Sequence, residues 1–188
     1  MSKQAFFLAF FFSFIFVRAS AQPIFSAQNG TMSIFSKTSL EDISGESKAV
    51  KSILNTTTNE VLIIASIRQF HFPKGLMEEH FNENYMESDK YPTATYTGKI
   101  NETIDYSVKG TYPVTTTGKL KIHGVEKDRT EKGTLTIDGS KITMHASLKI
   151  KMDDFKIDKP KLVNENIAEE IDVTLDIPYT PYIKPESK

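Results

Sequence analysis

The chain of 188 residues contains no cysteine. Disulfide bonds, thiol catalysis, cysteine-ligated zinc and iron–sulfur clusters are therefore excluded. The chain also lacks an excess of basic residues, because 23 Lys and Arg stand against 24 Asp and Glu, for a net charge of -1. A surface without that excess does not provide the attraction that binding to a phosphate backbone requires, so nucleic acid is not an expected partner.

Catalytic and metal-binding motifs are absent as well. No HExxH, GxSxG, P-loop or GxGxxG pattern occurs, and the four histidines lack the i, i+4 spacing of a helical zinc site. Asp153 and Asp154 are adjacent near an expected strand end, where neighbouring side chains point to opposite faces and do not form a catalytic pair. We therefore expect a protein that is not an enzyme and holds neither a metal nor a cofactor. A metal site built from distant residues, and a hydrolase or isomerase acting on a lipid, are weaker alternatives.

The N-terminal segment differs in composition from the rest of the chain. Lys3 is followed by an almost unbroken apolar run from Ala5 to Val17, and then by the small residues Ala19-Ser20-Ala21. This order is typical of a secretory signal peptide, and the run is shorter than the roughly 20 apolar residues of a membrane-spanning helix. We expect residues 1–21 to be cleaved, which leaves residues 22–188 as one domain of a periplasmic or secreted protein without a transmembrane segment.

Beyond this segment, hydrophobic residues mostly alternate with polar ones. Six apolar residues occupy alternate positions from Ile142 to Met152, which predicts a strand with one dry and one solvated face. Asp138-Gly139 precedes this strand and predicts a tight hairpin. A more fully buried strand is expected at Val61-Leu62-Ile63-Ile64. The other strand signals are Leu120 and Ile122, then Ile171, Val173, Leu175 and Ile177, and less cleanly Met32, Ile34, Ile43, Val50 and Ile53.

These signals predict about eight strands separated by turns, which is typical of an antiparallel sandwich or barrel. One segment departs from the pattern: between Gly75 and Met86, apolar residues recur every four positions and glutamates fill the opposite side, which predicts an amphipathic helix. A second short helical or irregular stretch is expected from Pro160 to Glu169. Since neither follows a β-α-β rhythm, a parallel sheet is disfavoured.

Apolar and aromatic side chains are spread over the whole of this small sheet. Nine aromatic residues lie between Phe70 and Phe155, on successive expected elements. A packed core explains each of them singly. An eight-stranded barrel, however, has the size at which the interior either just fills or holds one small ligand. A continuous apolar lining with a helix at the mouth is therefore compatible with a pocket for a lipophile.

Three segments resemble YceI-like proteins. Residues Phe72 to Tyr96 resemble the family's helix-to-strand signature, Gly118 to Lys127 matches its G-x-L-x-x-x-G-V-x-K strand, and Ser147 to Ile157 resembles its strand followed by D-F-x-I. The resemblance covers roughly residues 31 to 177. It implies an antiparallel up-and-down eight-stranded β-barrel, an extended lipocalin-like fold, exported to the periplasm. It also implies that the lumen holds a polyisoprenoid or a related amphiphilic lipid, as in the best understood members.

One feature departs from the family. Many members carry a histidine shortly after the first strand, whereas residues 33–45 of this chain contain none. If that histidine helps to hold a lipid headgroup elsewhere, this chain binds a different headgroup, binds in another way, or carries no ligand. The family-like dipeptides Tyr91-Pro92 and His123-Gly124 fit architectural roles, because proline keeps the preceding residue extended and glycine permits a bend.

We therefore expect an exported, non-catalytic barrel that sequesters or carries a polyisoprenoid, a quinone or a fatty-acid derivative. Burial of apolar area, at about 25 cal/mol per Å², drives such binding without demanding an exact polar match. The alternative is a structural or interaction barrel of the cell envelope whose core is filled by its own side chains. The sequence leaves a homodimer open.

The candidate ligand-binding residues come from the apolar faces of the expected strands and helix, and a register error of one residue would invert a strand. His80, Lys90 and His123 are candidates for headgroup binding near the mouth, although surface and strand-end roles fit them equally well. The residues expected to line the lumen are Phe70, Phe72, Met77, Phe81, Tyr85, Tyr96, Leu120, Ile122, Leu135, Ile137, Ile142, Met144, Leu148, Ile171, Val173 and Leu175.

Overall fold

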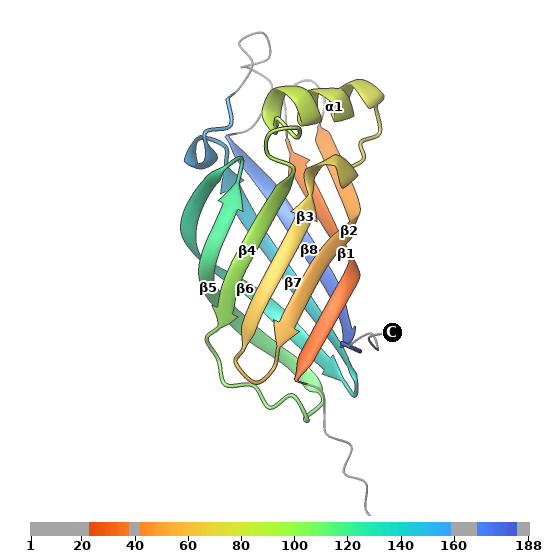
Figure 1. The fold of residues 1–188 in the computed structure, drawn as a ribbon, viewed down its shortest axis with the longest axis vertical. Coiled ribbons are helices and arrows are strands. Elements are labelled where there is room, and N and C mark those ends of the chain that lie inside the picture. Colours follow the sequence, from red (N-terminus) through yellow and green to blue (C-terminus); the bar gives the residue numbers. More distant parts are fainter. Residues whose placement is uncertain (1–22, 38–41, 159–168, 184–188) are drawn as a thin grey trace, which may run out of the picture.

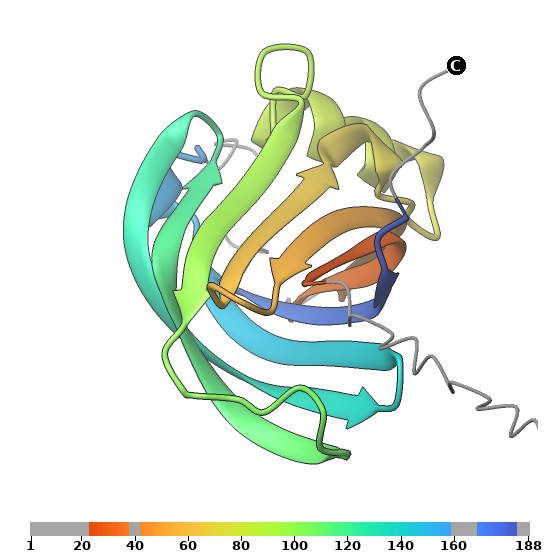
Figure 2. The same cartoon turned by 60° about the horizontal axis from the view of Figure 1, so that its bottom comes forward.

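The structure, a computed structural model, describes residues 23–37, 42–158 and 169–183. Eight antiparallel strands form a closed barrel in chain order, and the last strand (blue) pairs with the first (red) in Figures 1 and 2. This confirms the up-and-down eight-stranded barrel predicted from the sequence. The strands are β1 (Ile24–Ser36), β2 (Ile43–Asn55), β3 (Glu60–Ser66), β4 (Thr93–Ile100), β5 (Gly110–Ile122), β6 (Val125–Asp138), β7 (Lys141–Lys151) and β8 (Glu170–Pro181).

Tight hairpin turns set the register between neighbouring strands. The turn between β5 and β6 is His123-Gly124, and both residues have positive φ angles, 50° and 76°. Such a pair is typical of the two-residue turns that match the twist of antiparallel strands. Gly139, with φ of 63°, begins the turn between β6 and β7 that Asp138-Gly139 predicts. Both turns keep the alternating apolar faces of their strands directed into the barrel.

The expected helix lies between β3 and β4. It comprises α1 (Gly75–His80) and a π-helical turn, Phe81–Tyr85, that continues it directly. Figure 1 shows it at the upper end of the barrel. Shorter 3₁₀ turns occur at Ile67–Gln69 and Asp153–Phe155. Asp153 and Asp154 therefore lie in a turn after β7 rather than on a strand end, which corrects the sequence expectation.

Two predicted segments lie outside the described residues. The expected signal peptide, residues 1–21, is one of them, so its cleavage stays a prediction. The second expected helix, Pro160 to Glu169, is the other, since only Glu169 of that stretch is described.

The expectation of a more fully buried strand at residues 61–64 is wrong, and β2 shows the same effect. The run Val61 to Ile64 is not uniformly buried, because Val61 and Ile63 are buried while Leu62 and Ile64 are half-buried. Ile53 in β2 is 45% exposed, between buried neighbours. The reason is the same in both strands. A barrel wall is one sheet thick, so every second side chain faces outward whatever its hydrophobicity.

The lower end of the barrel, near the β6–β7 turn, is solid. Leu135, Ile142 and Ile177 are at most 1% exposed there, and Tyr179 is buried beside them. The Tyr179 hydroxyl lies 2.6 Å from Ser52 Oγ, and Ser52 donates its own proton to the carbonyl of Leu62 at 2.7 Å. Since a serine hydroxyl has one proton, Tyr179 is the donor to Ser52. The buried hydroxyls of Tyr179 and Ser52 are thus both satisfied.

Tyr179 makes the stability of the barrel sensitive to alkaline pH. Burial raises the pKa of Tyr179 far above its ordinary value, and the hydrogen bond to Ser52 offsets only part of that shift. A tyrosine with a raised pKa stabilises the native state fully below the unfolded pKa of about 10, and this contribution is lost as the pH rises further. We expect Tyr179→Phe to cost about 1 kcal/mol at neutral pH, as for a lost hydrogen bond, and to flatten the alkaline decline.

Urea denaturation followed by circular dichroism between neutral and strongly alkaline pH measures both effects. Tyr112→Phe is the matched control, because the Tyr112 hydroxyl donates to the Val108 carbonyl in a hydrogen bond that is exposed to solvent. If Tyr179→Phe and wild type lose stability equally steeply above about pH 10, Tyr179 is not the group responsible.

Candidate functional site

Between the solid end and the helix, the barrel is hollow. The lumen contains a cavity of about 450 Å³, which lies within the range of about 300–1,000 Å³ typical of small-molecule sites. Side chains from all eight strands line it, and most of them are apolar. A wall of this kind favours an apolar ligand, because it offers few partners for polar groups.

The helix and the segment before it cover the open end. Met77, Phe81 and Tyr85, one turn apart, all reach the cavity. The Phe81 ring lies 4.9 Å from the Phe72 ring and 5.5 Å from the Phe70 ring. Phe72 in turn packs on β2 at Gly45, where an added Cβ would come within 2.6 Å of the Phe72 ring. An aromatic layer therefore separates the lumen from the outside at this end.

The structure brings most of the predicted lining residues together. The residues in the cavity wall are Phe70, Phe72, Met77, Phe81, Tyr85, Tyr96, Leu120, Ile122, Met144, Leu148, Ile171, Val173 and Leu175. Leu135, Ile137 and Ile142 also face inward, but they lie in the solid end and are at most 2% exposed, so their assignment to the lining is corrected. Strand alternation fixes the face of a side chain but not its height along the barrel. Contact of the wall residues with a ligand stays a prediction.

Of the three headgroup candidates, only His80 reaches the cavity, from the end of α1. Lys90 is exposed, 3.8 Å from Glu87 Oε1. His123 lies outside the lining: its Nε2 is 2.7 Å from Glu87 Oε2, and its Nδ1 is 3.4 Å from the Phe155 carbonyl oxygen. His123 thus connects the β5–β6 turn to the segments that precede β4 and follow β7. Both of its ring nitrogens are thus engaged outside the cavity wall.

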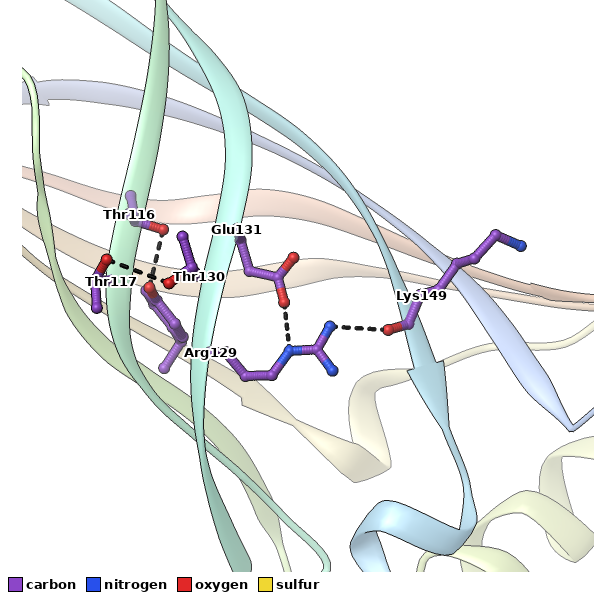
Figure 3. Close-up of polar contacts among 7 residues, drawn as sticks. Thr116, Thr117, Arg129, Thr130, Glu131 and Lys149 are labelled. Atoms are coloured by element: carbon purple, nitrogen blue, oxygen red, sulfur yellow. Dashed lines mark hydrogen bonds and ion pairs between the residues drawn. The ribbon is translucent and has the colours of Figure 1, made fainter.

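A small group of polar residues interrupts the apolar wall. The Tyr96 hydroxyl donates to Thr116 Oγ1 at 2.9 Å, and Glu131 is the partner of Thr116 in the β5–β6 register. Arg129 Nε donates to Glu131 Oε1 at 2.6 Å, and Arg129 Nη2 donates to the Lys149 carbonyl at 3.0 Å (Figure 3). Tyr96, Thr116 and Glu131 line the cavity. Arg129 does not line the cavity but donates the hydrogen bond to Glu131. We call these four residues the polar cluster.

Only Tyr96 of this cluster was singled out from the sequence. The available signal was the two-residue phase of β6: Arg129 and Glu131 fall on the same alternate positions as Leu135 and Ile137, which face inward. The negative charge of Glu131 also contributes to a shift in the pKa of Tyr96. Burial raises the pKa of Tyr96, and the Glu131 carboxylate raises it further, while the hydrogen bond to Thr116 opposes both. Tyr96 therefore acts as a neutral hydrogen-bonding group.

The cluster lies where β6 and β7 separate. These strands pair only over Gly133–Asp138 and Lys141–Ala146. Residues 125–132 of β6 pair with β5 alone, and residues 147–151 of β7 pair with β8 alone. Figure 3 shows the Arg129 side chain spanning this split from β6 to β7. Residues from both sides of the split line the cavity, among them Glu131 and Leu148.

A closed antiparallel barrel with one solid end, an apolar cavity and a helix over the other end defines an extended lipocalin-like barrel with an internal ligand-sized space. The family model for the YceI-like domain matches residues 14–179. The chain therefore belongs to the YceI-like family, as the sequence resemblance indicated. No curated protein matches it significantly.

Solved structures show the same fold at low sequence identity. A polyisoprenoid-binding domain from Saccharophagus degradans has a TM-score of 0.73 and 15% identity, over 86% of this chain and 99% of that one. BcnA from Burkholderia cenocepacia has a TM-score of 0.67 and 17% identity, over 79% and 95%. The Campylobacter jejuni YceI protein has a TM-score of 0.61 and 19% identity, over 77% and 88%.

The described residues contain neither a cluster of metal ligands nor a membrane-spanning helix. Within residues 23–37, 42–158 and 169–183, no three His, Asp or Glu side chains gather as a metal site would require. Over the same residues, no helix has the length and hydrophobicity to cross a membrane.

Proposed function

We propose that this protein binds one single-tailed amphiphilic lipid in the barrel lumen and serves as an exported, non-catalytic carrier or sequestering protein. The observation that carries the proposal is the apolar cavity of about 450 Å³. A polyisoprenoid, a quinone or a fatty-acid derivative suits it, since a long apolar tail gains about 25 cal/mol for each Å² it removes from water. The family membership supports the proposal, because one structural relative is a polyisoprenoid-binding domain.

Binding accounts for the wall better than catalysis does. Glu131 is the one carboxylate among the described residues that line the cavity, and its Oε1 is already paired with Arg129. A lipid hydrolase or isomerase requires a positioned acid–base pair or a nucleophile next to its base. Export is supported by the apolar run at residues 5–17 and the small residues that follow it.

The hollow lumen also distinguishes this function from that of a structural barrel filled by its own side chains. Self-filling describes the solid end, where Leu135, Ile142 and Ile177 are buried. It does not describe the space between Met144 and the helix, which is large enough for a ligand. A purely structural barrel would gain stability by filling that space, because an empty cavity forfeits packing contacts.

We expect the exported protein to purify with one lipid per chain. The full-length protein, with its own leader, is produced in a Gram-negative host and recovered from the periplasmic fraction, and native mass spectrometry measures its mass before and after organic extraction. The expected result is a single mass increment that is released on extraction as a prenyl, quinone or acyl compound. An apo mass, together with no thermal shift on adding a polyprenol, a menaquinone or a fatty acid, would contradict the proposal.

A further inference from the structure

The polar cluster offers a ligand one acceptor and one donor. Glu131 uses Oε1 to accept the Arg129 hydrogen bond, and among the described residues no partner is present for its Oε2. Thr116 accepts a hydrogen bond from Tyr96, so its own hydroxyl proton is available to donate. Thr116 and Glu131 are directly paired across β5 and β6, and both line the cavity. Inward side chains at such paired positions are close neighbours.

The geometry around Tyr96 keeps this pair accessible from the lumen. Gly98, two residues along β4, leaves the inner wall flat, and an added Cβ there would come within 2.7 Å of the Tyr96 hydroxyl. Tyr96 therefore lies along the wall over Gly98. The Tyr96 side chain thus reaches Thr116 without crossing the cavity.

The charge balance of the cluster selects against anionic groups. Arg129 and Glu131 form an ion pair with no net charge, and the guanidinium is already engaged by Glu131 and by the Lys149 carbonyl. Glu131 is a cavity-lining residue and Arg129 is not, so an anion in the lumen would meet a carboxylate first. Lys132 also borders the cavity, but it falls on the outward-facing phase of β6 and is exposed. Repulsion between like charges is strong where the surroundings are apolar.

We propose that Glu131 and Thr116 form the headgroup subsite of the lumen and that it takes an uncharged hydroxyl group, as in a polyprenol or a quinol. The hydroxyl donates to Glu131 Oε2 and accepts from Thr116, while Arg129 positions the carboxylate. A carboxylate headgroup lacks the proton to donate, and a carboxylate or a phosphate is repelled because each is anionic at neutral pH. This inference rests on the proposed function and narrows its three lipid classes to neutral, hydroxyl-bearing lipids.

Three ligands with one tail test the selectivity: farnesol, farnesoic acid and farnesyl phosphate. Dissociation constants are measured at neutral pH by titration of the lipid-free protein, with native mass spectrometry for stoichiometry. We expect wild type to bind farnesol about tenfold or more tighter than either anion. Glu131→Gln keeps the shape and removes the charge, so the preference for farnesol over farnesoic acid is expected to shrink by about tenfold. Thr116→Val is expected to weaken farnesol binding alone.

Glu126→Gln is the matched control, because it makes the same change on the outer face of β6, where Glu126 pairs with Lys119 at 2.7 Å. It is expected to leave all three affinities unchanged. Equal affinity of wild type for the three ligands would overturn the headgroup subsite, even if Glu131→Gln does not fold. An unchanged preference in a folded Glu131→Gln protein would overturn it as well. Wild type that binds none of the three, and carries no other lipid, would instead refute the proposed function.

Discussion

Replacing Ala146 by tryptophan is expected to weaken lipid binding strongly while leaving the barrel folded. Ala146 lines the cavity on β7 and stands between Gly133 on β6 and Leu175 on β8 in the strand register. An indole at this position extends into empty space rather than into packed atoms, so it occupies the lumen at the level of the ligand. We expect roughly a hundredfold loss of affinity for a prenol, equivalent to about 2.7 kcal/mol.

Ser147→Trp is the control for this substitution. Ser147 is the next residue of β7, it is exposed, and its side chain points away from the lumen. It introduces the same indole on the same strand without filling the cavity. Native mass spectrometry of both variants, with circular dichroism to verify folding, gives the comparison. A folded Ala146→Trp protein that binds a prenol as tightly as wild type does would mean that the ligand lies elsewhere than in the lumen.

The architecture could be predicted from the sequence because its signals are local. In β7, five apolar residues alternate with polar ones, and the structure buries Ile142, Met144 and Ile150 accordingly. Asp138-Gly139 and His123-Gly124 mark hairpin turns that the structure contains. Strand period and turn chemistry involve residues close together in the chain, so one sequence is sufficient to recognise them.

The depth of the cavity could not be predicted in the same way. Ile142 and Met144 are successive inward residues of β7, yet only Met144 borders the cavity. The difference arises from other strands: Tyr179 and Leu54, both buried, belong to the solid end with Ile142. Whether a lumen is filled at a given height depends on the summed side-chain volumes of eight strands, and no single strand carries that information.

The polar cluster was missed for a related reason. Arg129 and Glu131 lie among other charged residues, Lys127 and Asp128, in a stretch that is typical of a solvated strand. Their inward position is set by the phase of β6, which the pairing with β5 fixes by placing Glu131 opposite Thr116. N-terminal to Gly133, β6 has no partner in β7. The charged side chains on the inner face of this part of β6 reach both the lumen and the split between the strands.

Truncation of Leu135 should cost far more stability than truncation of Leu148. Leu135 is fully buried in the solid end, paired with Met144 on β7, so Leu135→Ala leaves a void among packed atoms. Such a change typically costs about 2–5 kcal/mol, from lost transfer free energy and lost contacts around the void. Leu148 already borders the cavity and is half-buried, so Leu148→Ala removes fewer contacts and is expected to cost about 1 kcal/mol.

Equilibrium urea denaturation of the lipid-free variants measures this difference, and a bound lipid should change it in one variant only. A prenol in the lumen contacts Leu148, so its addition should stabilise wild type more than Leu148→Ala, whereas Leu135→Ala should gain as much from the lipid as wild type does. Equal costs for the two truncations in the lipid-free protein would contradict the division into a solid and a hollow end. Because Leu135 and Leu148 are the same residue type on neighbouring strands, the contrast depends on their height in the barrel and not on their chemistry.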